Sequence, residues 1–138
     1  MSGSQPTLDQ RRAKHAWDAV QHALKRSGDH QGQDSKKFGG EARRLPMRIM
    51  VSGLGQALAF LEAKNEVRGL LAELSDWVLE RRGLGPGAGR DLLQAVIGRN
   101  SDFLRRATDE TLAYLQWLKR FAEAEGLTDE HEAQGGQR

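Results

Sequence analysis

The stretch LPMRIMVSGLGQALAFL, residues 45–61, decides the fold. Its apolar residues are so dense that a helix built from it is apolar on almost every face, which is typical of a central helix packed on several sides. A narrow stripe is the exception: Arg48, Ser52, Gln56 and Ala59. We predict a helix over 46–62, with Pro46 in its first turn, where a missing N–H costs nothing. Gly53 and Gly55 each lower helicity by about 1 kcal/mol relative to Ala, which indicates the close approach of another backbone.

Helical periodicity extends outward from this segment in both directions, and no segment alternates with the period of two that strands require. The further predicted helices are 8–27, 65–82, 90–97 and 101–125. Helices of this length joined by short connections favour an all-α fold, a small antiparallel helical bundle of about five or six helices.

The predicted bundle forms one domain over 8–125. The segments outside the predicted helices, of which two lie within this domain, are polar or rich in glycine, a composition that does not bury enough apolar surface to order a chain. They are a disordered N-terminus at 1–7, a flexible basic loop at 28–40, a glycine-rich connector at 83–89 and a flexible tail at 126–138.

The composition excludes several classes of protein. The 138 residues include no cysteine, which rules out disulfide frameworks, thiol catalysis and zinc–cysteine sites. The N-terminus has neither the basic region nor the apolar stretch of a secretory signal. The longest apolar stretch falls far short of the ~20 residues of a membrane span. We expect a cytoplasmic protein without a membrane partner.

Positive charge is concentrated in the first third of the chain, although the net charge is only +2. The segment from Arg11 to Arg48 contains ten Lys and Arg residues but only four acids, Asp18, Asp29, Asp34 and Glu41. Such a segment attracts polyanions such as nucleic acid. From charge alone, a solvated helical surface is the favoured interpretation.

No set of residues predicts catalysis or a metal site. His15, Asp18 and His22 share one face of the first helix with metal-like spacing, but the cations Arg11 and Lys25 flank them and no second helix supplies matching ligands. The glycines of 83–89 fit neither phosphate-loop pattern, because no strand precedes them and no G-K-[ST] follows. We expect no catalytic residue, no metal and no cofactor.

The helix over 101–125 carries two apolar stripes, of which the second is aromatic: Phe103, Tyr114, Trp117 and Phe121. Core packing is its first interpretation, a subunit interface the second and base stacking the third. The opposite face contains Arg105, Arg106, Gln116 and Arg120 and should meet water or phosphate.

Two segments are more specific than these patterns. The first is residues 45–61, and the second is RATDE at 106–110 followed by WLKRFAEA at 117–124. Together with Arg12-Ala13 and Trp17 they resemble the small subunit of the Cmr complex, the type III-B CRISPR RNA-guided effector of bacteria and archaea. The resemblance covers about residues 10–125. One departure is Ser52, where the family often has Asn.

The resemblance implies an α-helical protein that is not a nuclease. Copies of such a subunit stack head to tail as a minor filament, beside a major filament that holds the guide RNA. They line the groove for the target RNA and the guide–target duplex, mainly the target strand. The implied partners are other Cmr subunits, further copies of the chain and RNA, with no small-molecule substrate.

Site residues are predicted from charge and helical phase, because the shared segments consist mostly of packing residues. Lining an RNA groove requires cations that meet phosphates without reading bases. The RNA-binding candidates are Lys36, Lys37, Arg43, Arg44 and Arg48, followed by Arg105, Arg106, Lys119 and Arg120. The protein-interface candidates are Phe103, Tyr114, Trp117 and Phe121. The alternative is a helical scaffold that contacts only proteins and whose charges are solvated.

Overall fold

The computed structural model describes residues 4–27, 33–85 and 91–127, and the predicted all-α bundle is confirmed over this part of the chain. The α-helices are α1 (Leu8–Ser27), α2 (Gln33–Ser52), α3 (Leu54–Ala63), α4 (Arg68–Ser75), α5 (Leu92–Gly98) and α6 (Ser101–Ala124). A 3-10 turn, η1 (Asn65–Val67), precedes α4, and a π-helix, η2 (Asp76–Arg81), follows it. No helix in the described part is both long and apolar enough to span a membrane.

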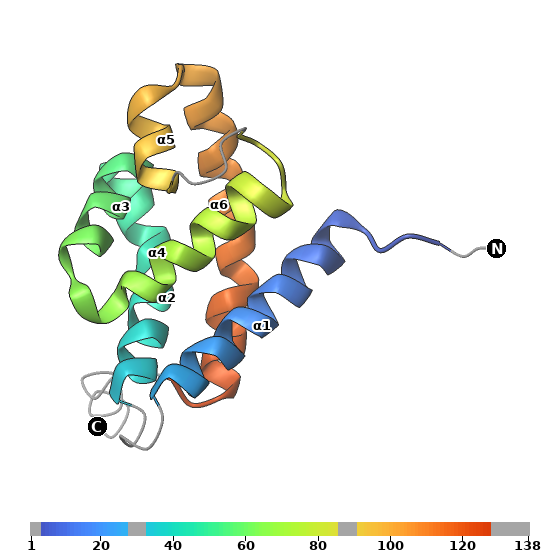
Figure 1. Cartoon of the computed structure of the whole chain (residues 1–138), viewed down its shortest axis with the longest axis vertical. Helices are drawn as coiled ribbons and strands as arrows, with labels where there is room; N and C mark the ends of the chain where they lie inside the picture. Colours follow the sequence, from blue (N-terminus) through green and yellow to red (C-terminus); the bar gives the residue numbers. More distant parts are fainter. Residues whose placement is uncertain (1–3, 28–32, 86–90, 128–138) are drawn as a thin grey trace.

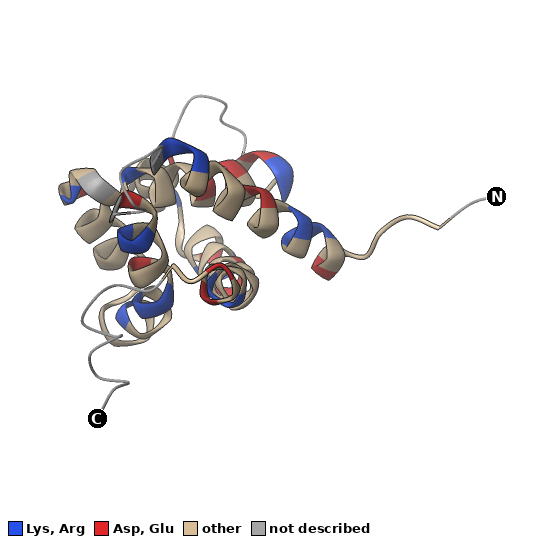
Figure 2. Ribbon diagram, turned by 90° about the horizontal axis from the view of Figure 1, so that it is seen from below, with Lys and Arg blue, Asp and Glu red and all other residues tan. Residues whose placement is uncertain are grey.

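The helices form two layers, seen face-on in Figure 1 and from below in Figure 2. α1 and α4 lie in front of α2 and α6, while α3 and α5 lie at the upper end of Figure 1. α2 runs antiparallel to α6, since Gly39 near the start of α2 lies against Leu127, just beyond the end of α6. α1 and α6 run in the same general direction, as the pairs His15–Tyr114 and Trp17–Phe121 show.

The predicted limits of the first and last helices agree with their capping. Thr7 Oγ1 accepts from the backbone N–H of Gln10 at 3.0 Å, and Gln10 Oε1 accepts from the N–H of Thr7 at 2.7 Å. This reciprocal pair satisfies two orphan donors and starts α1. The Asn100 side chain caps α6 by accepting from the N–H of Phe103 at 2.9 Å.

The predicted flexible loop at 28–40 is wrong for 33–40, which form the first two turns of α2; residues 28–32 lie outside the described residues. Phe38, Ala42, Leu45 and Ile49 are buried at helical spacing, so one face of α2 continues the core backward from Pro46. Gly39 reflects packing, not flexibility. A Cβ there would lie 1.8 Å from the carbonyl oxygen of Leu127.

The single helix predicted over 46–62 is wrong in two ways. Pro46 lies inside α2, where it removes one backbone hydrogen bond. The chain also breaks between α2 and α3 at Gly53, which has φ +88° and ψ 159°. Almost only glycine adopts this region. A Cβ at Gly53 would meet nothing within 4 Å, so the expected close approach of another backbone is not the reason for this glycine.

The other predicted boundaries differ less. The helix predicted over 65–82 is divided into η1, α4 and η2. Residues 83–85 of the predicted connector are irregular, and Leu127 of the predicted tail is buried. Residues 1–3, 86–90 and 128–138 lie outside the described residues, so the predictions of disorder there remain predictions.

Gly53→Ala should lower the free energy of unfolding by about 1–3 kcal/mol, because alanine is strained in this backbone region. The matched control is Gly55→Ala. Its Cβ would lie 3.5 Å from Val96 Cγ1, an ordinary contact, and alanine favours the helix by about 1 kcal/mol. Urea denaturation of both variants measures the difference. Equal destabilisation by the two changes would contradict the assigned role of Gly53.

Candidate functional site

A buried carboxylate on α6, Glu110, joins three elements. Arg12 of α1 donates from Nε to Oε2 at 2.7 Å and from Nη2 to Oε1 at 3.0 Å. Arg82, just after η2, donates to Oε1 at 3.0 Å, and the indole N–H of Trp77 donates to Oε2 at 2.8 Å. Burial alone would raise the pKa of Glu110, but the hydrogen bonds from Arg12 and Trp77 outweigh it and lower that pKa. Glu110 is therefore a structural anion saturated with donors.

His15 lies beside this cluster and is held at both ring nitrogens. Nε2 contacts Asp76 Oδ2 at 2.7 Å, and Nδ1 contacts the Tyr114 hydroxyl at 2.7 Å. An ionised Asp76 only accepts, so Nε2 carries a proton and donates to it, while Nδ1 shares its hydrogen bond with the Tyr114 hydroxyl. Burial raises the pKa of Tyr114 well above its ordinary value, so the hydroxyl keeps its proton.

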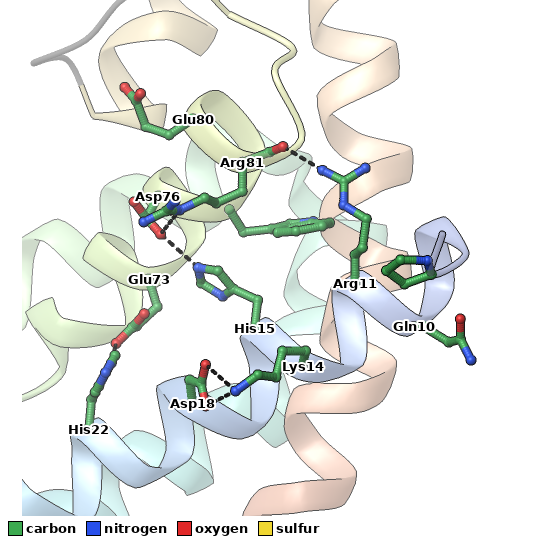
Figure 3. A pocket seen from close by; sticks show the side chains of 12 residues that line it. Gln10, Arg11, Lys14, His15, Asp18, His22, Glu73, Asp76, Glu80 and Arg81 are labelled. Carbon is green, nitrogen blue, oxygen red and sulfur yellow. Dashed lines mark hydrogen bonds and ion pairs between the residues drawn. The ribbon is translucent and has the colours of Figure 1, made fainter. Parts of the chain in front are cut away.

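A groove of about 820 Å³ separates α1 from α4 and η2 (Figure 3). Its charged groups are largely paired within the chain. His22 contacts Glu73 at 2.9 Å, Lys14 contacts Asp18 at 3.2 Å and Arg81 contacts Asp76 at 3.3 Å. His15, Asp18 and His22 thus point to three different partners. Across the described ranges, no group of three or more His, Asp or Glu side chains is placed to hold a metal ion.

Cations of α2 and the C-cap residue of α3 surround a second buried carboxylate, Glu41. Arg44 lies 2.9 Å from Oε2, Lys64 lies 3.3 Å from the same oxygen, and Arg48 lies 3.4 Å from Oε1. Burial opposes ionisation, but the hydrogen bond from Arg44 and the other cations lower the pKa of Glu41. The guanidinium of Arg48 also lies 3.9 Å from the centroid of the Phe60 ring. Part of the predicted RNA-binding set therefore supports the fold.

The outer face of α2 is apolar and exposed, and helical periodicity did not predict the exposure. Met47, Met50 and Val51 are 67%, 71% and 75% exposed. The prediction that this segment is packed on several sides is wrong here, because α2 lies at the edge of its layer and no described element covers this face. Exposed contiguous apolar side chains mark interaction surfaces. The residues of the hollow beside them are Arg43, Arg44, Met47, Arg48, Val51 and Ser52.

The second predicted RNA-binding set lies along α6, in the same layer as α2 (Figure 1). Arg105, Arg106 and Arg120 are exposed and Lys119 is half-buried. Arg105 forms an ion pair with Asp102, one turn earlier. The α2 set is divided similarly: Lys37 is exposed, whereas Lys36, Arg43, Arg44 and Arg48 are half-buried.

The interface predicted from the aromatic stripe is wrong for two of its four residues. Tyr114 is fully buried, and Phe103 is almost so. Both face the core, so they do not reach a neighbouring subunit. Trp117 and Phe121 are half-buried. Phe121 packs against both Trp117 and Trp17, of which Trp17 is 40% exposed. For Trp117 and Phe121 the interface remains a prediction.

Comparisons with known proteins agree with this fold. The profile of the CRISPR-associated protein family Cas_Cmr5 matches residues 8–125. The CRISPR system Cmr subunit Cmr5 of Thermus thermophilus is 34% identical over 115 residues, covering 81% of this chain and 90% of the relative. The crystal structure of a CRISPR-associated Cmr5 family protein from the same organism has a TM-score of 0.68 at 29% identity, covering 87% of this chain and 97% of that one.

Glu110→Gln should lower the free energy of unfolding by roughly 3 kcal/mol, the usual cost of removing one partner of a buried ion pair. The pKa of Glu110 is lower in the folded state, so its stabilisation is complete above the unfolded value of about 4.3 and is lost as the pH falls through the folded value. The variant should lose less stability than wild type on acidification. Asp109→Asn, an exposed neighbour, is the control. Denaturation that did not distinguish the two variants would contradict the role of Glu110.

Proposed function

Because the chain belongs to the family of CRISPR-associated Cmr5 proteins, we propose that it is a non-catalytic structural subunit of a type III-B RNA-targeting complex. It stacks in a minor filament, helps to hold the target RNA and the guide–target duplex, and acts in the cytoplasm. The match over residues 8–125 carries this proposal, since it includes every described helix. Glu110 and both ring nitrogens of His15 are engaged by hydrogen bonds within the chain, which supports a role without catalysis.

The proposed RNA contacts are electrostatic. Arg106 and Arg120 on the outer side of α6 are exposed, so their guanidinium groups can meet phosphates without disturbing the core. Around Glu41, the side chains of Arg44, Arg48 and Lys64 remain partly exposed, so cations also lie at this part of the surface. Both helices lie in one layer (Figure 1), so both can offer cations to one phosphate backbone.

Replacing both Arg106 and Arg120 with Gln should weaken binding of single-stranded RNA by the purified chain. For each phosphate that is no longer bound, the slope of log affinity against log salt should fall by about 1, for every RNA sequence alike. Arg81→Gln, in the groove of the other layer, is the matched control. Fluorescence anisotropy at several salt concentrations measures both quantities. An unchanged affinity and slope in the double variant would exclude binding of RNA by α6, and Arg43→Gln then tests α2.

The proposed stacking joins two different surfaces of neighbouring copies. The α2 face, defined by Met47, Met50 and Val51, lies in one layer, and the groove of Figure 3 opens in the other. A contact between unlike surfaces continues from copy to copy as a filament. The charges are complementary: Arg43, Arg44 and Arg48 border the α2 face, whereas the acids of the groove outnumber its Lys and Arg residues. These acids are Asp18, Glu73, Asp76 and Glu80, against Arg11, Lys14 and Arg81.

Met50→Glu should weaken self-association and incorporation into the complex at least about tenfold, because an unpaired carboxylate would be buried between the two copies. The fold should be unaffected, since Met50 is 71% exposed. Ile97→Glu, at an equally exposed apolar position on α5, is the matched control. Sedimentation velocity and co-purification with the other subunits measure the effect. Wild-type assembly of the Met50 variant would exclude the α2 face as an interface.

A second candidate function is a helical scaffold that contacts only proteins. The ion pairs of Arg44 and Arg48 with Glu41 favour it, because they give these cations a structural role without RNA. In that case the Met50 variant would lose assembly, while the Arg106 and Arg120 variant would retain full RNA binding by the complex.

A further inference from the structure

A hollow of about 400 Å³ lies where the first turn of α1 passes the middle of α6. It is separate from the groove of Figure 3 and from the α2 face. Its walls combine an aromatic ring, a carboxylate, an amide, a guanidinium and one small side chain. The lining residues are Asp9, Ala113, Gln116, Trp117 and Arg120.

The indole of Trp117 is held in place on two sides. Its N–H donates to Asp9 Oδ1 at 3.0 Å. Its ring packs against Phe121, with centroids 5.7 Å apart, and Phe121 meets the Trp17 ring edge-on at 5.3 Å. A ring fixed before a ligand arrives loses little rotational freedom on binding.

Asp9 connects this ring to the buried cluster of Glu110. Arg12, which binds Glu110, also donates to Asp9 Oδ1 at 3.1 Å. Hydrogen bonds from Trp117 and Arg12 lower the pKa of Asp9, so its carboxylate is an anionic acceptor at neutral pH. The position of the indole is therefore tied to the α1–α6 packing.

The space beside the indole exists because of a small residue. Ala113 lies one turn before Trp117 on the same side of α6, where a longer side chain would extend across the ring. Gln116 and Arg120 are exposed at the rim of the hollow. The amide supplies both a donor and an acceptor, and the guanidinium pairs with phosphate. An aromatic wall, an amide and a cation within about one helical turn match the parts of one nucleotide.

We infer that this hollow binds one unpaired nucleobase of a single-stranded RNA. The base stacks on the indole of Trp117, and Arg120 pairs with the adjoining phosphate. A base inside a duplex is covered on both faces by its neighbours, so only an unpaired base can enter. Since every base has an aromatic face, stacking requires no particular sequence. This inference rests on the proposed RNA-binding function and adds a base contact to its phosphate contacts.

The test compares two RNA strands of equal length and charge, oligoadenylate and a strand whose ribose–phosphate backbone lacks bases, titrated against the full chain at low salt. The intact strand should bind about 5- to 100-fold more tightly, the effect of one or a few stacking contacts. Trp117→Ala should remove this advantage, whereas Trp117→Phe should retain much of it. Leu104→Ala, an exposed apolar position on the same helix, should leave the advantage unchanged.

Three outcomes would overturn the inference. Equal affinity of wild type for both strands would exclude a base contact while leaving the proposed phosphate contacts intact. Binding of neither strand at low salt would contradict the proposed RNA-binding function itself. If Trp117→Ala kept the base-dependent advantage but prevented incorporation into the complex, the hollow would be a protein contact.

Discussion

The rest of the structure depends on the ionised carboxylate of Glu110. A carboxylate buried without partners would unfold the chain or become protonated, so its surroundings must supply donors from several directions. They come from α1 through Arg12 and from the segment around η2 through Trp77 and Arg82. Satisfying one anion thus fixes how three distant parts of the sequence pack, and it places the Trp77 ring against Tyr114 and His15.

The π-helix follows from the same constraint. Trp77 and Arg82 are five residues apart, and in an α-helix such residues point about 140° apart, at about 100° per residue. In η2 the N–H of Arg82 instead donates to the carbonyl of Trp77 at 2.7 Å. This wider turn brings both side chains toward one face, where both donate to Glu110. π-turns are rare and mostly occur as single turns within longer helical segments.

How well the sequence predicts an element depends on whether local or distant residues determine the structure of that element. Helices 8–27 and 101–124 were predicted closely because their periodicity is long and their caps are local, Thr7 and Asn100. The α2–α3 region was mispredicted because glycine is required at two positions for different structural reasons. Gly39 is required by Leu127, nearly 90 residues away in the chain, and Gly53 by its own backbone angles. Composition alone made Gly39 resemble a loop residue and Gly53 a packing residue.

The site was less predictable than the fold for a related reason. Helical phase groups cations on a face, but it does not reveal a carboxylate buried beneath them, as Glu41 lies beneath Arg44 and Arg48. Nor does it reveal that Tyr114 points inward while Met50 points outward. Helical periodicity shows which residues share a face of a helix, whereas the burial of that face depends on which other elements pack against it.

The buried acids also affect the surface. Glu110 contacts two arginines, and Glu41 contacts two arginines and a lysine. These cations lie at the edge of the core, where they remain partly exposed. The net charge of +2 does not describe this local arrangement of charge, on which the attraction of polyanions depends. Some of the side chains that neutralise the buried acids are thus the same ones that we propose as phosphate contacts, Arg44 and Arg48.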